Sequence, residues 1–227
     1  MRYRCQHLVA LIASGWLMIL LAPPSLGAAR AHAELFHTKQ IYFADLDPFT
    51  KWNAVVARTE RQRADARKLC PAGDKEDCVL ARWRRFVAVL RGLPILDRVT
   101  VANSVLNRVP YVPAIVNWRD PDHWETPFEF LQYGGQCEDF AIAKLAALSE
   151  SGIDERDLRL VVVWDRTKRL AHAVAVVFVA GQALVLDNQI HEVTPDTEIT
   201  RYVPFYAINR LGWWRPAIAA RAAMALR

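Results

Sequence analysis

Cys137 is the residue of this chain whose position best suits covalent chemistry. It follows the glycine turn Gly134-Gly135 and begins a helical pattern whose first turn carries the acids Glu138 and Asp139. At a helix start, the free backbone N–H groups and the positive end of the dipole favour a thiolate over a thiol. A thiolate is a nucleophile, but catalysis also requires a base and a group that orients this base.

A predicted β-hairpin supplies both partners. Segments 171–179 and 183–187 are apolar and rich in β-branched residues, and Ala180-Gly181 predicts a two-residue turn between them. In that register His172 and Asp187 are diagonal neighbours on one face of the hairpin, within reach of a hydrogen bond. A three-residue turn would place the two side chains on opposite faces, so their pairing depends on the turn.

Together these residues predict acyl-transfer chemistry. The Cys137 thiolate would attack an acyl carbon, His172 would carry the thiol proton to the leaving amine, and Asp187 would fix the imidazole tautomer. The backbone N–H of Cys137 is the expected oxyanion donor. His123 and His191 remain alternative bases. Each member of the trio also has a purely structural interpretation, as a buried thiol, a core histidine and a turn aspartate.

The N-terminus has the layout of a secretory signal peptide. Arg2 and Arg4 precede an apolar run over 8–22, and the small-residue pattern Ala31-His32-Ala33 follows. The alternative is an uncleaved membrane anchor, but the run of about 15 residues is shorter than the roughly 20 that a spanning helix needs. We therefore predict that residues 1–33 are removed on export to the periplasm, which leaves no membrane span.

The mature chain, residues 34–227, suits a single domain with an ample apolar core. The full sequence has 29 Lys and Arg residues against 24 Asp and Glu residues, and the signal segment carries three arginines and no acid. The mature net charge is therefore only +2, and its basic residues are dispersed among acids. This pattern argues against nucleic acid as a partner.

The cysteine count leaves Cys137 without a structural partner. Cys5 leaves with the signal peptide, while Cys70 and Cys78 flank the short polar loop 71–77 between two helical patterns. In an oxidising compartment these two residues are expected to form a disulfide. The alternative, a metal site, lacks the second pair of ligands that zinc sites show.

Helices are predicted in the first part of the chain and strands in the second. Helical periodicity predicts helices over 47–69, with Asp47-Pro48 as its start, and over 77–91, 95–107 and 137–151. Strand patterns cover 158–164, 171–179, 183–187 and 201–209. Segment 111–133 is expected to be looped, and 213–227 to end the chain as a helix packed through its tryptophans. This order predicts an α+β fold with N-terminal helices packed on one face of an antiparallel sheet.

Five segments resemble the bacterial transglutaminase-like cysteine proteases of the LapG type. They are 123–131 (HWETPFEFL), 134–144 (GGQCEDFAIAK), 171–174 (AHAV), 185–188 (VLDN) and 203–209 (VPFYAIN). The resemblance implies a papain/transglutaminase-like fold and a Cys-His-Asp triad on Cys137, His172 and Asp187. It also implies a periplasmic endopeptidase that cuts a large surface adhesin near its N-terminus, at a paired-alanine site, and so releases a biofilm. An inner-membrane receptor of the LapD type, which senses cyclic di-GMP, would sequester this protease.

One position departs from the family pattern. Members of the family usually have an acid directly before the nucleophile and bind calcium through these acids, whereas this chain has Gln136. The tentative calcium ligands are therefore Gln136, Glu138 and Asp139, with one formal charge missing and a lower expected affinity. A bound cation would offset the field of the carboxylates beside Cys137. The simpler interpretation is that these acids only favour the helix start.

Two other functions remain open at this point. The same trio could transfer its acyl group to an amine instead of water, as a protein acyltransferase does. Alternatively, the chain could be a non-catalytic periplasmic binding module that retains the fold. Mass analysis of products would separate hydrolysis from ligation, and labelling of Cys137 by a thiol-directed probe would favour catalysis.

Overall fold

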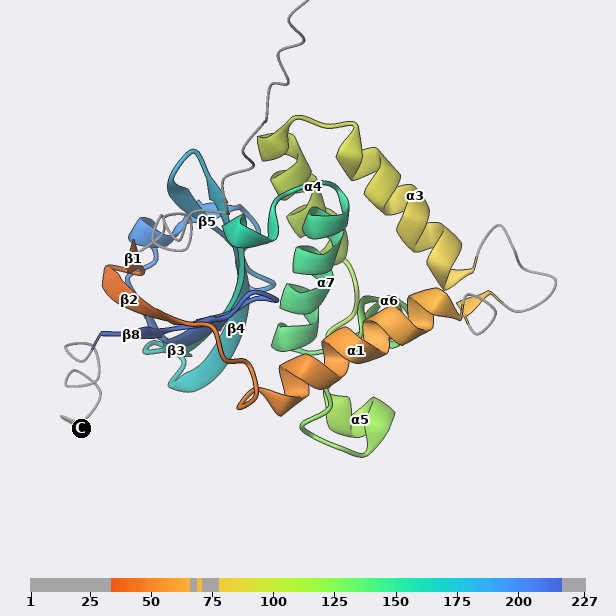
Figure 1. Ribbon diagram of the computed structural model, residues 1–227, viewed down its shortest axis with the longest axis horizontal. Coiled ribbons are helices and arrows are strands. Elements are labelled where there is room, and N and C mark those ends of the chain that lie inside the picture. Colours follow the sequence, from red (N-terminus) through yellow and green to blue (C-terminus); the bar gives the residue numbers. More distant parts are fainter. Residues whose placement is uncertain (1–33, 66–68, 71–77, 218–227) are drawn as a thin grey trace, which may run out of the picture.

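Helices pack against one side of a curled antiparallel sheet (Figure 1). The computed structural model describes residues 34–65, 69–70 and 78–217. The expected signal peptide at 1–33 lies outside these residues, as does most of the expected terminal helix. No helix within the described ranges is long and apolar enough to cross a membrane.

Eight strands of the described residues form one sheet in the order β1-β2-β8-β7-β3-β4-β5-β6, and all neighbours are antiparallel. Their bounds are β1 Glu34–Leu35, β2 Thr38–Phe43, β3 Leu158–Asp165, β4 Leu170–Val179, β5 Gln182–Leu186, β6 Thr194–Pro195, β7 Tyr202–Ile208 and β8 Trp213–Pro216. The four predicted strands correspond to β3, β4, β5 and β7. The prediction missed the other four, which are short or lie near the ends of the chain.

The expected terminal helix over 213–227 is wrong at its start, because Trp213–Pro216 forms strand β8. This strand pairs with β2 near the other end of the described chain, and the two lie side by side in Figure 1. Side chains of a strand point alternately to opposite faces. Accordingly, Trp214 is buried, whereas the neighbouring Trp213 stacks on Phe43 with 4.6 Å between ring centroids.

The β4–β5 hairpin has the predicted register. Val179 pairs with Gln182 across a two-residue turn. Both turn residues have positive φ, 50° at Ala180 and 83° at Gly181, as turns that match the twist of a hairpin require. The even register that brings His172 and Asp187 to one face is therefore confirmed.

Six α-helices and one short 3-10 helix, η2 Glu155–Asp157, precede β3 in the described residues. The α-helices are α1 Thr50–Ala64, α3 Val79–Arg91, α4 Ile95–Leu106, α5 Ala114–Trp118, α6 Pro127–Tyr133 and α7 Cys137–Glu150. The first begins at Thr50, with Phe49 at its N-cap, so the predicted start at Asp47-Pro48 is wrong.

Segment 111–133 was expected to be looped, but it contains α5 and α6. Two of its three prolines begin helices instead of breaking them: Pro113 is the N-cap of α5 and Pro127 is the first residue of α6. Proline suits these positions because the first helical N–H groups have no partner within the helix. Thr126 caps α6 by accepting from the backbone N–H of Glu129, whose side chain accepts in turn from the N–H of Thr126.

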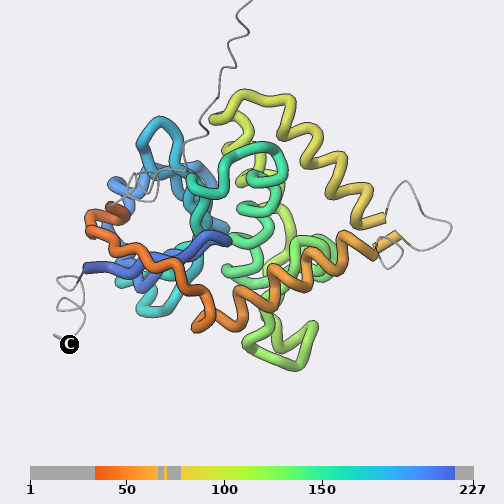
Figure 2. Tube along the Cα trace, in the orientation of Figure 1, coloured from red at the N-terminus to blue at the C-terminus, as the bar shows by residue number. Residues whose placement is uncertain are grey.

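Helix α7 lies at the centre of the larger core. It packs on β3 and β4 with one side and on α3, α4 and α6 with the others, as the tube in Figure 2 shows. Its buried apolar residues are Phe140, Ala141, Ile142, Ala143, Leu145, Ala147 and Leu148. A helix that is buried on nearly all sides has little freedom to shift, so the position of Cys137 at its start is closely fixed.

A second, smaller core lies on the opposite face of the sheet. Alternate residues of β3 and β4 are buried there together with Leu35, Phe36, Tyr202 and Trp214. The guanidinium of Arg159 is also buried, 3.8 Å from the ring centroid of Trp214 and 4.7 Å from that of Phe178. Helices do pack on one face of the sheet, as predicted, but the curl of the sheet buries its other face as well.

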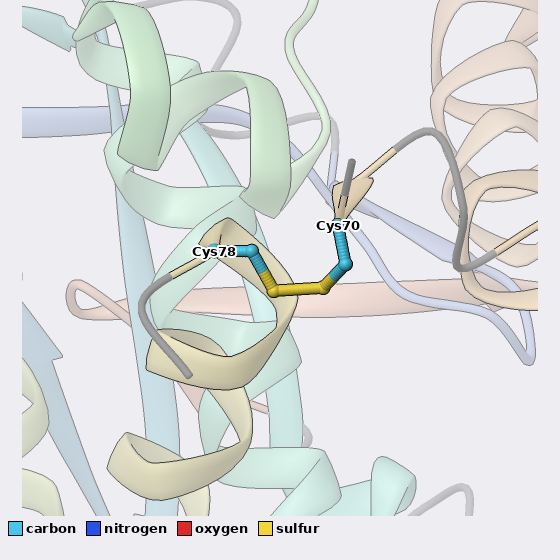
Figure 3. Close-up of a disulfide and its surroundings, with 2 residues drawn as sticks. All are labelled: Cys70 and Cys78. Carbon is cyan, nitrogen blue, oxygen red and sulfur yellow. A yellow bond between two sulfur atoms is a disulfide. The ribbon is translucent and has the colours of Figure 1, made fainter. Parts of the chain in front are cut away.

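Cys70 and Cys78 form a disulfide between α1 and α3 (Figure 3). Their Cα atoms are 5.0 Å apart, within the usual range for a disulfide. Cys137 is the free cysteine of the described residues.

The turn before α7 gives a prediction about stability. Gly134 has φ 77° and ψ −176°, a conformation almost confined to glycine, and a Cβ added there would lie 2.5 Å from the carbonyl oxygen of Pro110. We expect Gly134→Ala to lower the free energy of unfolding by about 1–3 kcal/mol more than Gly181→Ala, as measured by urea titration. Gly181 is a matched control because it also has positive φ but has no atom within 4 Å of such a Cβ. Equal losses would contradict this account.

Candidate active site

The start of α7 is held by a buried carboxylate. Asp139 Oδ2 accepts a hydrogen bond from the backbone N–H of Gln136 at 2.8 Å, and Oδ1 accepts from that of Glu125 at 2.7 Å. Burial raises the pKa of Asp139 to about 8, while these two N–H groups favour its carboxylate form. Asp139 thus joins the segment before α6 to the first turn of α7, and its role here is structural.

The Cys137 thiol lies between the first turn of α7 and strand β4. It donates to Glu138 Oε2 at 3.2 Å, and its sulfur accepts from the backbone N–H of Ala173. Burial raises the pKa of Cys137 to about 12, and the charge of Glu138 acts in the same direction. The helix start alone predicted a thiolate, so this expectation is wrong for the free protein. Burial and the adjacent carboxylate outweigh the dipole.

His172 and Asp187 meet as the hairpin register predicted. Nε2 of His172 lies 2.8 Å from Oδ1 of Asp187. Both side chains are almost fully buried, with exposed fractions of 1% and 0%. If Nε2–H donates to the carboxylate, Nδ1 is left as the unprotonated nitrogen that can accept a proton.

Two further residues hold this pair, and the sequence reasoning missed both. The hydroxyl of Tyr202 on β7 donates to Asp187 Oδ2 at 2.6 Å, and the backbone N–H of Gln189 donates to Oδ1 at 2.8 Å. Although burial raises the pKa of Asp187, its hydrogen bonds and the charge of His172 hold it below its usual value. The contact with Gln189 has a local signal, because an aspartate in a turn commonly accepts from the backbone N–H two residues later. No such signal existed for Tyr202.

The side chain of Gln189 also contacts the imidazole. Its Nε2 lies 3.3 Å from Nδ1 of His172, and its Oε1 accepts from Lys168 Nζ. The lysine contact fixes the amide orientation, so Gln189 donates to the nitrogen that would act as base. Among the described residues, the thiol of Cys137 is hydrogen-bonded to Glu138 and Ala173 and not to this ring.

The two alternative bases lie elsewhere. The ring of His123 stacks on Trp118 at 4.3 Å between centroids, and its Nε2 lies 3.6 Å from Glu129. His191 is exposed, and its backbone carbonyl accepts from Asn103. Of the three histidines discussed, only His172 pairs with Asp187.

Lys144 is an unexpected charge beneath the site. It lies two turns after Cys137 on α7, its side chain is fully buried, and its Nζ has no hydrogen-bond partner. Burial lowers its pKa to about 7, while the charge of Asp187 opposes this shift. The sequence reasoning missed Lys144 because a lysine in a helical pattern is normally exposed.

The tentative calcium ligands are close together but do not fit a calcium site in this arrangement. Gln136 Nε2 donates to Glu138 Oε1 at 2.7 Å, so an amide N–H points at one candidate ligand oxygen. Both oxygens of Asp139 already accept backbone N–H groups. Within the described ranges, no three His, Cys, Asp or Glu residues are grouped so that they could hold a metal ion.

The Tyr202–Asp187 hydrogen bond predicts a pH-dependent stability. Tyr202→Phe leaves one buried carboxylate oxygen without its donor, which should cost about 1–3 kcal/mol of unfolding free energy at pH 7. Because the folded pKa of Asp187 is lowered, its carboxylate stabilises the fold above the unfolded value of about 3.9, and this contribution is lost as the pH falls towards the folded pKa. The cost of the substitution should therefore shrink below about pH 4.

Urea titrations at several pH values would measure this change. Tyr42→Phe is the matched control, because the Tyr42 hydroxyl donates to the uncharged carbonyl of Leu211 at 2.8 Å. Its cost should be small and independent of pH. A Tyr202→Phe cost that stayed constant with pH would show that the hydroxyl does not act on the charged form of Asp187.

Comparison with solved structures shows that the fold is shared. The calcium-bound form of Legionella pneumophila LapG matches with a TM-score of 0.58 and 23% sequence identity, over 74% of this chain and 97% of that chain. A second LapG structure matches at 0.55 and 24%, over 71% of this chain and 87% of that chain. An EGTA-treated LapG matches at 0.55 and 24%, over 71% and 84%. This likeness, helices on a curled antiparallel sheet, is to a transglutaminase-like fold.

The sequence itself gives the family. None of the curated protein sequences compared with the chain matches it. The family described as bacterial transglutaminase-like cysteine proteinase matches residues 67–214, which is more than half of the chain and includes Cys137, His172 and Asp187. We conclude that this chain belongs to the bacterial transglutaminase-like cysteine proteinase family.

Proposed function

We propose that this protein is a periplasmic cysteine endopeptidase that uses Cys137, His172 and Asp187 as its catalytic residues. The observation that carries the proposal is the buried hydrogen bond of 2.8 Å between His172 and Asp187, one residue from the strand N–H that contacts the Cys137 sulfur. The family supports a cysteine peptidase. The buried pair supplies the base and its orienting group, and the sulfur supplies the nucleophile.

The reaction begins from a neutral thiol. Cys137 turns its S–H from Glu138 towards Nδ1 of His172, and Gln189 gives up its contact with that nitrogen. The proton moves to Nδ1 as the sulfur bonds to the substrate carbonyl carbon, and Asp187 stabilises the imidazolium. This order fits the raised pKa of Cys137, because base and nucleophile then act in the same step.

The remaining steps release the two products and restore the free enzyme. The imidazolium donates its proton to the amine nitrogen as the C–N bond breaks, which leaves a thioester on Cys137. A water molecule attacks this thioester, His172 takes one of its protons, and the sulfur leaves with that proton to restore the thiol. The backbone N–H of Cys137, at the first helical position, is the proposed donor to the oxyanion of both tetrahedral intermediates.

The substrate and its control follow from the family resemblance. We propose a large secreted adhesin as the substrate, cut at a paired-alanine site near its N-terminus so that cells leave a biofilm. An inner-membrane cyclic di-GMP receptor of the LapD type would hold the enzyme in check. Export with removal of residues 1–33 would place the remaining single domain, 34–227, in the same compartment as both partners.

Loss of either reacting group should abolish cleavage. We expect Cys137→Ala and His172→Ala to lower kcat/KM for an adhesin fragment with a paired-alanine site by roughly 10³-fold or more. The double variant should be no worse than either single one, because residues that act as a unit are not additive. Cleavage rates from gel electrophoresis and product masses would measure this, and the masses would separate hydrolysis from ligation.

The controls test the choice of base. His37 is exposed and its ring contacts the carbonyl of Thr197, so His37→Ala should cleave like the wild type. If His191→Ala lost activity while His172→Ala kept it, the base would be misassigned. Equal cleavage by wild type and Cys137→Ala would end the peptidase proposal.

A further inference from the structure

The carboxamide of Gln136 occupies a defined place beside the nucleophile. Its Nε2 donates to Glu138 Oε1 at 2.7 Å and lies 3.4 Å from the carbonyl oxygen of Pro121. Its Oε1 accepts from the backbone N–H of Ala114 at 3.5 Å. Two acceptors and one donor, from three segments, agree on a single orientation of the amide.

This orientation disfavours a cation at the same place. Calcium binds six to eight oxygens at about 2.3–2.6 Å, and carboxylates supply most of its affinity. Here the amide N–H group points towards Glu138 Oε1, an oxygen of one tentative calcium ligand, and towards the carbonyl oxygen of Pro121. A partial positive charge already lies between them, and an ion would have to displace it.

The remaining acid is not free to compensate. Asp139 Oδ1 and Oδ2 accept from the N–H groups of Glu125 and Gln136, and the side chain is fully buried. Each oxygen keeps a second lone pair, but an ion could reach it only if the buried helix start opened, and loss of either hydrogen bond would cost about 1–3 kcal/mol. Glu138 is then the one carboxylate of the three tentative ligands that could bind calcium without breaking the helix start.

We propose that the Gln136 carboxamide takes the place of a bound calcium ion, linking Glu138 to the loop at Pro121 by hydrogen bonds, so that this protein neither binds nor requires calcium. The claim that activity does not require calcium rests on the proposed peptidase function, whereas the claim that calcium is not bound does not rest on it. A corollary is that one substitution, Gln136→Asp, creates a calcium site. It removes the N–H donor and adds a carboxylate whose oxygens are available to an ion together with those of Glu138.

Calorimetric titration of calcium chloride into the folded protein, after dialysis against EGTA and then buffer, tests the binding directly. We expect no saturable binding by the wild type up to about 1 mM, and binding by Gln136→Asp with a Kd of about 10⁻³ M or tighter. Gln182→Asp is the matched control: it adds the same charge at an exposed position beside the β4–β5 turn, and it should not bind. The melting temperature with and without calcium gives a second readout of the same difference.

Each result bears on the proposal. Saturable binding by the wild type that Glu138→Gln abolishes would overturn it. Absence of binding by both the wild type and a folded Gln136→Asp would overturn the assignment to Gln136. Should Gln136→Asp fail to fold, judged by circular dichroism, Gln136→Glu replaces it in the same titration.

Cleavage assays separate this inference from the proposed function. Wild-type activity should be unchanged within about twofold by EGTA and by added calcium, whereas activity of Gln136→Asp should fall with EGTA and return with calcium. A wild type that cleaves only with calcium would overturn the inference and keep the peptidase. A wild type that neither cleaves nor binds calcium would overturn the peptidase and keep the inference about binding.

Discussion

The buried carboxylate of Asp187 is the constraint on which the geometry of the site depends. An unpaired charge with no exposed surface is strongly unfavourable, so its oxygens must be satisfied by donors. These come from three segments: the ring of His172 on β4, the backbone of Gln189 after β5, and the hydroxyl of Tyr202 on β7. Because each donor lies on a different segment, the orientation of the imidazole is tied to the register of the sheet.

The position of Cys137, the proposed nucleophile, is fixed by a separate constraint, the burial of α7. Packing on nearly all sides determines where the helix begins, and Asp139 fixes its first turn to the segment before α6. The same burial makes the Cys137 thiol harder to ionise. Precise placement and easy ionisation are thus in conflict at this helix start, and the proposed transfer of the thiol proton to His172 during attack would resolve the conflict.

Local patterns predicted the contact between His172 and Asp187, and long-range contacts account for what was missed. The turn Ala180-Gly181 decides the face of His172 and Asp187, and a turn of this kind can be recognised within a few residues. Tyr202 reaches Asp187 only because β7 curls beside β3, and β8 is a strand because it pairs with β2, some 170 residues earlier in the sequence. The four residues of β8 are too few to show a periodicity that would predict such pairing.

Gln136 gives a second example of what the sequence could not predict. Its lack of charge is evident from the sequence, but the direction of its amide group depends on the fold. From the sequence, glutamine at this position is a missing negative charge with an amide oxygen that can still bind calcium, and the direction of its N–H group is not indicated. In the fold its amide reaches both Glu138 and the carbonyl of Pro121, which a shorter side chain could not do. Glu138 therefore keeps a neutral hydrogen-bond donor on one oxygen, while its other oxygen accepts the thiol proton of Cys137. Both oxygens of this carboxylate are thus hydrogen-bonded beside Cys137, and the Gln136 amide supplies one of the two donors.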